Sequence, residues 1–145
     1  MHDDAHFEAL ENMYLAAKIN DFYKPTISVS DSAATIEIDV TDRFFHSTGA
    51  AHGSVYFKML DDAAFFAASS REREVFLLTT SFTTYLTRPI SSGTLRSVGT
   101  VVNQTRSQFI AEAIAYDSDG YEIGRGSGIF VRGRFPLVEA DGYRV

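Results

Sequence analysis

The run of residues 53–70 constrains the fold of this chain more than any other segment. It consists mostly of alanine, aromatic and aliphatic residues, and its only charged residues are Lys58, Asp61 and Asp62. A helix formed by such a run is apolar on most sides and has to be covered by the rest of the chain. Its apolar part, Val55 to Ser70, would be about 24 Å long as a helix, which is too short to cross a membrane. We therefore expect one central helix wrapped by other elements.

The segments around this helix have the pattern of β-strands. Residues 34–40 alternate between apolar and polar side chains, and four later segments are rich in β-branched and aromatic residues. These segments cover residues 75–87, 94–103, 108–117 and 121–131, and residues 117–120 are typical of a hairpin turn. The order predicts an α+β fold in which a meander of antiparallel strands curls around the central helix.

The amino-terminal segment has the spacing of a second helix. Its apolar residues recur three and four positions apart, at Phe7, Leu10, Met13, Tyr14 and Ala17. This spacing predicts a helix over residues 4–18, with Asp3 or Asp4 as its cap. Pro25 then breaks the chain before the first expected strand.

Length and composition exclude several classes of protein. The 145 residues suit a single domain over residues 1–145. The absence of cysteine excludes a disulfide framework, a thiolate nucleophile and a zinc–thiolate site. A net charge of −6 disfavours nucleic acid as a partner, and no apolar run is long enough to span a membrane. The first four residues lack the features of a signal peptide, so we expect a soluble, cytoplasmic protein.

The turn before the central helix is the first candidate for chemistry. The first N–H groups of a helix have no partners within it and carry the positive end of its dipole. Gly53 leaves room for a ligand at this end, and Gly49 relaxes the preceding turn. Such a terminus can hold a carbonyl oxygen whose negative charge grows during nucleophilic attack. The structural alternative is that glycine here serves only as a cap or in a tight turn.

Asp61 is the second candidate, because a carboxylate in an apolar helix is costly unless it is paired or functional. It follows His52 by nine residues, which places the two on opposite sides of the helix and about 13 Å apart along its axis. Within one chain they cannot meet around a single substrate atom. Either they are unrelated and Asp61 is solvated, or a two-fold partner brings its own Asp61 to this helix start.

Two motifs lie at these positions and on the strands that follow. The first is Gly49-Ala50-Ala51-His52-Gly53-Ser54, with Asp61 nine residues after the histidine; the second runs from Thr79 to Arg88-Pro89 and on to Gly93-Thr94-Leu95. Together they resemble the hotdog-fold acyl-CoA thioesterases, most closely the phenylacetyl-CoA thioesterase-like branch. The resemblance extends over residues 34–131 and implies a hotdog fold with an additional N-terminal helix.

The resemblance also implies catalytic roles. Asp61 corresponds to the catalytic carboxylate, which either attacks the thioester carbon or activates a water molecule. The Gly53 N–H of the partner chain would polarise the thioester carbonyl, and His52 would shape this turn and orient the thioester or a water molecule. Thr79 corresponds to a Ser or Thr that positions the water or the acid.

Two positions depart from the family pattern. His46 replaces an asparagine six residues before the histidine, and Ser54 replaces a second glycine after it. The His46 ring can still donate a hydrogen bond, and Ser54 suits the second position of a helix. We expect both, together with Thr79, to lie at the substrate-binding site.

The activity implied is hydrolysis of an acyl-CoA thioester to a free acid and coenzyme A. It requires no metal and no cofactor beyond the coenzyme A of the substrate, and it implies a homodimer, with a homotetramer as a further option. Two alternatives stay open: a non-catalytic acyl-CoA-binding module, and a hotdog hydratase or dehydratase that acts on enoyl thioesters.

Other residues have a structural and a functional interpretation. Asp62 is expected to face solvent or the dimer rim, with the alternative that it is the functional acid in place of Asp61. His2 and His6 are expected to be exposed. Arg88 is either structural or near the pantetheine channel. Six phenylalanines line an acyl pocket or belong to the core, and three arginines contact the phosphates of coenzyme A or are solvated. These are Phe44, Phe45, Phe57, Phe65, Phe66 and Phe82, and Arg125, Arg132 and Arg134.

Overall fold

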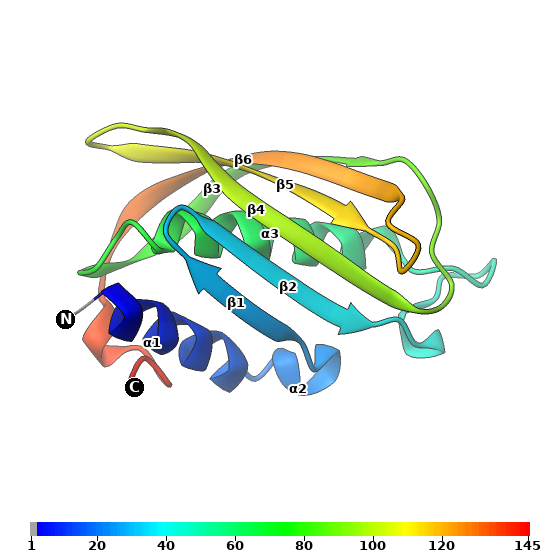
Figure 1. Cartoon of the computed structure of the whole chain (residues 1–145), viewed down its shortest axis with the longest axis horizontal. Coiled ribbons are helices and arrows are strands. Elements are labelled where there is room, and N and C mark those ends of the chain that lie inside the picture. The colour runs from blue at the N-terminus through cyan, green and yellow to red at the C-terminus, as the bar shows by residue number, and fades with distance from the viewer. Residues whose placement is uncertain (1–2) are drawn as a thin grey trace.

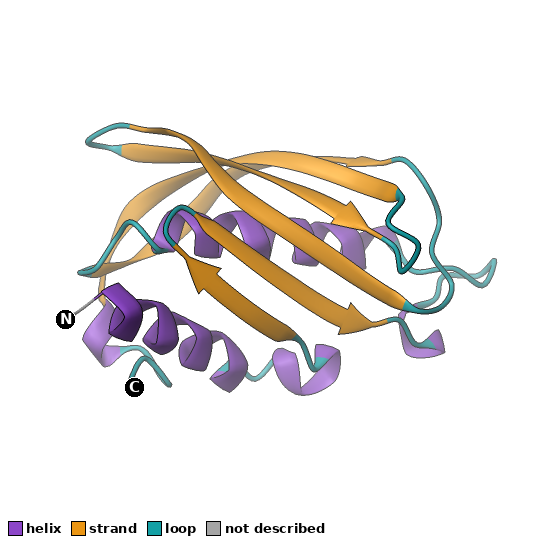
Figure 2. Ribbon diagram, in the orientation of Figure 1, coloured by secondary structure: helices purple, strands orange, loops and turns teal. Residues whose placement is uncertain are grey.

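The computed structural model describes residues 3–145. Its elements are α1 (Asp3–Ala16), α2 (Asn20–Tyr23), β1 (Thr26–Ser30), β2 (Ala33–Asp39), the 3-10 turn η1 (Asp42–Phe44), α3 (Gly53–Ser69), β3 (Val75–Leu86), β4 (Thr94–Gln104), β5 (Gln108–Tyr116), β6 (Glu122–Pro136) and η2 (Leu137–Glu139). Figures 1 and 2 show one twisted sheet lying over α3, with α1 alongside β1. The expected α+β fold with a central helix is confirmed.

The sheet differs from the expected meander at one strand. Its six strands are antiparallel, in the order β1-β2-β4-β5-β6-β3. Strands β4, β5 and β6 are consecutive neighbours, but β3 pairs with β6 at the far edge and not with β4. The prediction of a four-strand meander is therefore wrong for β3. The connection over residues 87–93 is long enough to carry the chain across the sheet, as Figure 1 shows.

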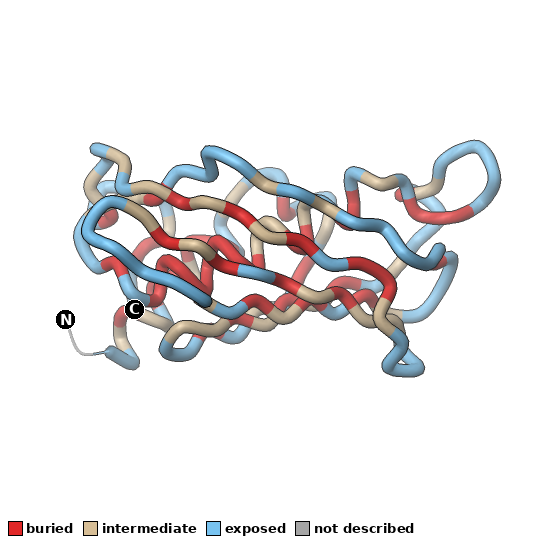
Figure 3. The backbone as a smooth tube through the Cα atoms, turned by 90° about the horizontal axis from the view of Figure 1, so that it is seen from above, coloured by how far each residue is buried: buried red, intermediate tan, exposed pale blue. Residues whose placement is uncertain are grey.

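Helix α3 lies close to the inner face of the sheet because the residues in contact are small. A Cβ atom added to Gly99 of β4 would stand 2.2 Å from the backbone oxygen of Ala63. On β5, Ala111, Ala113 and Ala115 are all buried. The buried segments of Figure 3 follow α3 and the strands around it. None of the helices within residues 3–145 is long and apolar enough to cross a membrane.

The segment between α1 and β2 contains elements that the sequence analysis missed. Helix α1 ends at Ala16, two residues earlier than expected, and the short α2 follows. Residues 26–30 then form β1, the first edge of the sheet. This strand is only five residues long and carries three hydroxyl side chains, so its apolar signal rests on Ile27 and Val29 alone. The turn into β2 holds Ser32 at a φ of 61°, a left-handed conformation that is uncommon for serine.

His6 is buried, so the expectation that it is exposed is wrong; His2 lies outside the described residues. The Nε2 atom of His6 lies 2.9 Å from the backbone oxygen of Ser69, and its Nδ1 atom lies 2.7 Å from the hydroxyl of Tyr143. The ring thus joins α1 to the end of α3 and to the C-terminal tail. Burial lowers the pKa of His6, which favours the neutral ring.

Strand β3 forms the second edge of the sheet. It is 12 residues long and pairs only with β6 among the described residues, so one row of its backbone N–H and C=O groups faces outward. Its exposed apolar side chains include Leu78 and Leu86. Proteins rarely leave so long an edge open, because it invites pairing with another strand.

Candidate active site

The turn before α3 is held in shape by its own backbone. The N–H of His46 donates to the carbonyl of Ala50, and the N–H of Gly49 donates to the carbonyl of His46. Gly49 has a φ of 84°, which a residue with a Cβ atom rarely adopts. The Nδ1 atom of His46 accepts a hydrogen bond from the N–H of Thr48 at 3.2 Å, so this ring is tied to the turn itself.

His52 caps α3. Its Nδ1 atom accepts a hydrogen bond from the N–H of Ser54 at 3.0 Å and lies 2.9 Å from the Ser54 hydroxyl. The N–H of Gly53, the first residue of the helix, takes part in no hydrogen bond within residues 3–145. An unused donor therefore stands at the positive end of the α3 dipole.

A cavity of about 310 Å³ opens beside this helix start. Its lining includes His46, Gly53, Tyr56 and Arg88. The hydroxyl of Tyr56 donates to the backbone oxygen of Arg88 at 2.7 Å, which joins the helix to the Arg88-Pro89 corner. The guanidinium of Arg88 lies over the ring of Tyr121, 4.1 Å from its centre. The start of α3 and the Arg88-Pro89 corner therefore border the same cavity.

Asp61 lies two turns further along α3 and is partly buried. The hydroxyl of Thr79 on β3 donates to its Oδ1 atom at 3.0 Å. Burial raises the pKa of Asp61 to about 6, and the Thr79 hydrogen bond opposes that rise. The charge of Asp62 raises the pKa further, and that of Lys58 lowers it. Asp61 thus changes its charge in the pH range in which a general base is most useful.

Asp61 and Thr79 line a second cavity of about 320 Å³, which we call the acyl cavity. It lies between α1, α3 and β3, and the side chains around Asp61 are mostly apolar: Met13, Ala17, Ile19, Phe65, Phe66, Phe76, Leu77 and Leu78. Pockets of this kind bind apolar groups beside a few polar ones. The contribution of α1 was not foreseen, because Met13 and Tyr14 have the spacing of ordinary core positions.

Asp62 is largely covered within its own chain, so the expectation that it faces solvent is wrong. Its Oδ2 atom lies 2.5 Å from Lys58 Nζ, and the side chains of Asp62 and Lys58 are 20% and 11% exposed. The hydroxyl of Tyr14 on α1 donates to the same oxygen at 2.6 Å. The packing of α1 against α3 covers this side of the helix, which the sequence pattern of α3 alone does not reveal.

The structure brings the candidate residues together in two groups. His46, His52, Gly53 and Ser54 lie at the start of α3, while Asp61 lies with Thr79 at the acyl cavity. The two cavities share no lining residue, and about 12 Å of helix separates Gly53 from Asp61. The donor and the carboxylate of one chain therefore cannot act on the same carbonyl group.

The other aromatic and basic candidates lie in different parts of the molecule. Phe65 and Phe66 line the acyl cavity, Phe44 is buried elsewhere, and Phe57 is 43% exposed against Phe82. Phe45 is partly buried and lines none of the cavities described here. Arg125 pairs with Glu122, and Arg132 pairs with Glu72 and Glu74; Arg134 is exposed.

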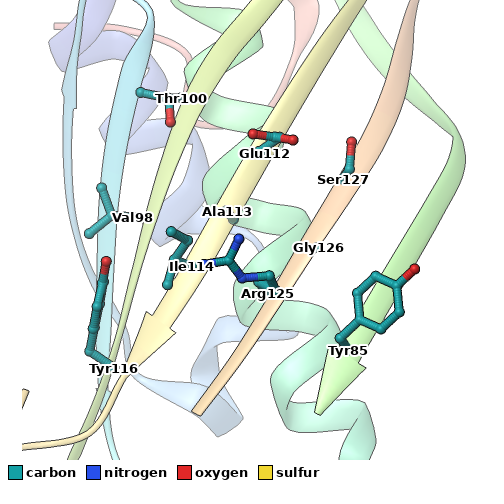
Figure 4. A pocket seen from close by; sticks show the side chains of 10 residues that line it. All are labelled: Tyr85, Val98, Thr100, Glu112, Ala113, Ile114, Tyr116, Arg125, Gly126 and Ser127. Atoms are coloured by element: carbon teal, nitrogen blue, oxygen red, sulfur yellow. The ribbon is translucent and has the colours of Figure 1, made fainter. Parts of the chain in front are cut away.

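A third cavity, of about 200 Å³, lies on the outer face of the sheet, away from α3. Figure 4 shows Glu112, Arg125 and Ser127 standing on the strands that form it, with the helix behind them. Arg125 lines this cavity, whereas Gly53, Asp61 and Thr79 do not. Within residues 3–145, no group of three or more His, Cys, Asp or Glu side chains is arranged to hold a metal ion.

Comparison with known proteins identifies the family. A model of the thioesterase superfamily matches residues 48–123, more than half of the chain. No curated protein sequence matches.

Several solved structures are similar. The PaaI protein from the phenylacetic acid degradation operon of E. coli is 18% identical, with a TM-score of 0.80 over 91% of this chain and 98% of that one. A putative esterase from Mycobacterium tuberculosis is 20% identical, with a TM-score of 0.76 over 81% and 98%. A thioesterase from Haemophilus influenzae is 15% identical, with a TM-score of 0.74 over 83% and 85%. Together with the helix wrapped by an antiparallel sheet, these matches confirm the hotdog fold, and the chain belongs to the thioesterase superfamily.

Proposed function

We propose that this protein hydrolyses acyl-CoA thioesters to a free acid and coenzyme A, with Asp61 as the catalytic carboxylate. Membership of the thioesterase superfamily supports thioester hydrolysis in general. The observation that carries the proposal is the setting of Asp61, which is a partly buried carboxylate beside a largely apolar cavity, held by one hydroxyl donor. With a pKa of about 6 it is ionised at neutral pH and still a competent proton acceptor.

Two routes lead to the same products. As a general base, Asp61 takes a proton from a water molecule whose oxygen bonds to the thioester carbon. The C–S bond then breaks, and the sulfur leaves as the thiol of coenzyme A after it is protonated. As a nucleophile, a carboxylate oxygen of Asp61 bonds to the thioester carbon, and the C–S bond breaks to release coenzyme A. Water then cleaves the resulting anhydride to the free acid and the Asp61 carboxylate. Both routes place negative charge on the thioester oxygen, which needs a hydrogen-bond donor.

We infer that this donor is the Gly53 N–H of a second copy of the chain. The N–H is unused and lies at the end of the helix dipole, but it lies about 12 Å along α3 from the Asp61 of its own chain. The open edge of β3 offers a surface on which two copies can pair. A two-fold dimer would then hold two identical sites, each with Asp61 from one chain and Gly53 from the other. The site needs no higher assembly.

The remaining candidates have supporting roles in this proposal. His52 and Ser54 fix the direction of the first turn of α3, so that the Gly53 N–H stays free. His46 and Arg88 line the cavity along which the pantetheine arm would approach. Thr79 orients the carboxylate of Asp61.

Thiol release from a panel of aromatic, short-chain and long-chain acyl-CoAs tests the proposal, with the native chain and Asp61→Asn compared side by side. Asparagine keeps the shape and can accept the Thr79 hydrogen bond, but it can neither take a proton nor attack. We expect turnover by the native chain and almost none by the variant. Full turnover by Asp61→Asn would refute the role of Asp61. Saturable binding without thiol release would instead favour a binding module, and hydration of an enoyl-CoA would favour a hydratase.

A further inference from the structure

Two neighbouring carboxylates line the acyl cavity, but only one of them is paired with a cation. Lys58 lies one helical turn before Asp62 and binds it at 2.5 Å. The Lys58 ammonium also lies 5.0 Å from the ring centres of both Tyr14 and Tyr23. Asp61, the adjacent residue, accepts its hydrogen bond from Thr79 on β3. The two carboxylates are therefore held in different directions by different elements.

Asp62 has more polar partners than a purely structural ion pair requires. An ion pair this little exposed gains little net stability, because both charges lose their hydration. Tyr14 nevertheless adds a hydrogen bond to the same carboxylate oxygen from α1. Burial, followed by the charge of Asp62, raises the pKa of Tyr14, so the phenol stays a donor. The Asp62 carboxylate is thus held by a cation and a hydroxyl group at once.

We propose that Lys58 is a positioning residue of the thioesterase site, which holds Asp62 away from the thioester and leaves Asp61 as the single reactive carboxylate. This inference rests on the proposed function. The polar residues that line the cavity with Asp61 are Thr79 from β3, Lys58 and Asp62 from α3, Tyr14 from α1 and Asn20 from α2, and Tyr23 of α2 lies against Lys58. Unopposed, the negative charge of Asp62 would hinder ionisation of its neighbour; the ammonium of Lys58 offsets it.

Four variants of the full chain test this assignment: Lys58→Met, Lys58→Arg, Asp62→Asn and the double variant Lys58→Met/Asp62→Asn. Methionine keeps most of the length of lysine without its charge, and arginine keeps the charge. Two readouts are needed. One is the acidic limb of the pH profile of kcat/KM, and the other is the titration of the Asp61 carboxyl carbon by NMR, which does not depend on turnover.

We expect the Asp61 titration midpoint to shift in opposite directions in Lys58→Met and Asp62→Asn. Lys58→Met leaves Asp62 uncompensated and moves the Asp61 midpoint up by about one pH unit. Asp62→Asn leaves Lys58 uncompensated and moves the midpoint down by about as much. The double variant returns toward the native value, and Lys58→Arg stays near it. A merely structural role would lower stability in these variants without moving the midpoint in opposite directions.

Midpoints that stay unchanged, or that move the same way in Lys58→Met and Asp62→Asn, would overturn the assignment. If Lys58→Met does not fold, Asp62→Asn and Lys58→Arg still test the role of Lys58. Asp62→Asn should lower the Asp61 midpoint, and Lys58→Arg should leave it near the native value. The NMR titration separates the two proposals. Shifted midpoints without any thioester hydrolysis would refute the proposed function alone, whereas hydrolysis with unshifted midpoints would refute the role of Lys58 alone.

Discussion

Helix α3 has two polar contacts of opposite character, one buried and one partly exposed. At its end, the ring of His6 contacts Ser69 and Tyr143 through both nitrogens and is inaccessible to solvent. In its middle, Asp61 has a single hydroxyl partner and borders a cavity. A buried polar group with all its partners holds the fold together, whereas one with few partners beside a cavity is available for chemistry. We expect changes at the two positions to affect stability and activity in opposite ways.

The largest effect is expected at Asp61. Asp61→Asn should reduce kcat by about a thousandfold or more, since it removes the carboxylate proposed to attack the thioester or to activate a water molecule. The same change should stabilise the fold at pH 7.5 by about 1 kcal/mol, allowing for the partial exposure of the side chain.

The stability difference has a defined pH dependence. Because the pKa of Asp61 is raised from 3.8 to about 6 in the folded chain, its ionisation weakens the fold as the pH rises through this window. Asp61→Asn should therefore be more stable than the native chain above pH 6, and this difference in stability should be absent below pH 4. Thermal unfolding of both proteins across this range measures it, and an Asp61→Asn variant less stable than the native chain at pH 7.5 would contradict the comparison.

The next largest effect is expected at the other end of the helix. Gly53→Pro removes the N–H proposed to bind the thioester oxygen, and should lower kcat by about a hundredfold or more. Proline suits the first position of a helix, and His52 already has an extended conformation with φ −61° and ψ 147°.

Gly53→Ala is the matched control for this change. It adds the same Cβ atom, 3.0 Å from the end of the Leu86 side chain, but keeps the N–H. Steady-state rates for the two variants separate the loss of the donor from crowding. Equal losses in both would show that the N–H itself is not needed.

Substitution of His6 should lower the stability of the fold and not its activity. His6→Leu removes the two contacts of the ring with the Tyr143 hydroxyl and the Ser69 carbonyl, at a cost of about 2 kcal/mol at pH 8. Because the pKa of His6 is lowered on folding, native stability falls as the pH drops below 6.5, where the unfolded chain takes up a proton. The cost of the substitution should therefore shrink toward pH 5 in denaturant titrations. Activity per folded molecule should change little, and a catalytic loss as large as that of Asp61→Asn would break the distinction between the two contacts.

The smallest effect is expected at Thr79. Thr79→Val removes the hydrogen bond that lowers the pKa of Asp61, so the acidic limb of the kcat/KM profile should move to higher pH. The rate at pH 7.5 should fall by about tenfold, the scale of one hydrogen bond to a charged group. Thr79→Ser keeps the hydroxyl and should resemble the native chain. An unshifted profile in Thr79→Val would mean that this contact does not control the charge of Asp61.

Much of the fold follows from local sequence patterns. The apolar run of α3 and the alternating strands predict elements whose ends lie within a few residues of those observed, except that β6 continues to Pro136. The position of β3 was not predictable in this way, because it depends on tertiary pairing with β6. The strand β1 was missed because only two of its five residues are apolar.

The candidate site was partly predictable from the sequence. The spacing of His52 and Asp61 already indicated that these two residues of one chain cannot meet around a single substrate atom. The Tyr14–Asp62 hydrogen bond could not be predicted from the sequence, because 48 residues separate its partners and Tyr14 has the spacing of a core residue. Contacts of this kind depend on how α1 packs against α3, and no local pattern encodes that packing.

The central claim is that each active site combines Asp61 of one chain with Gly53 of another, and mixing two inactive variants tests it most directly. Asp61→Asn and Gly53→Pro are unfolded together, refolded and assayed for thiol release, with each variant alone as the control. Random pairing would make half of the dimers mixed, each with one intact site, so the account predicts about a quarter of the native activity. Activity no higher than that of the separate variants, in a sample shown to contain mixed dimers, would contradict it.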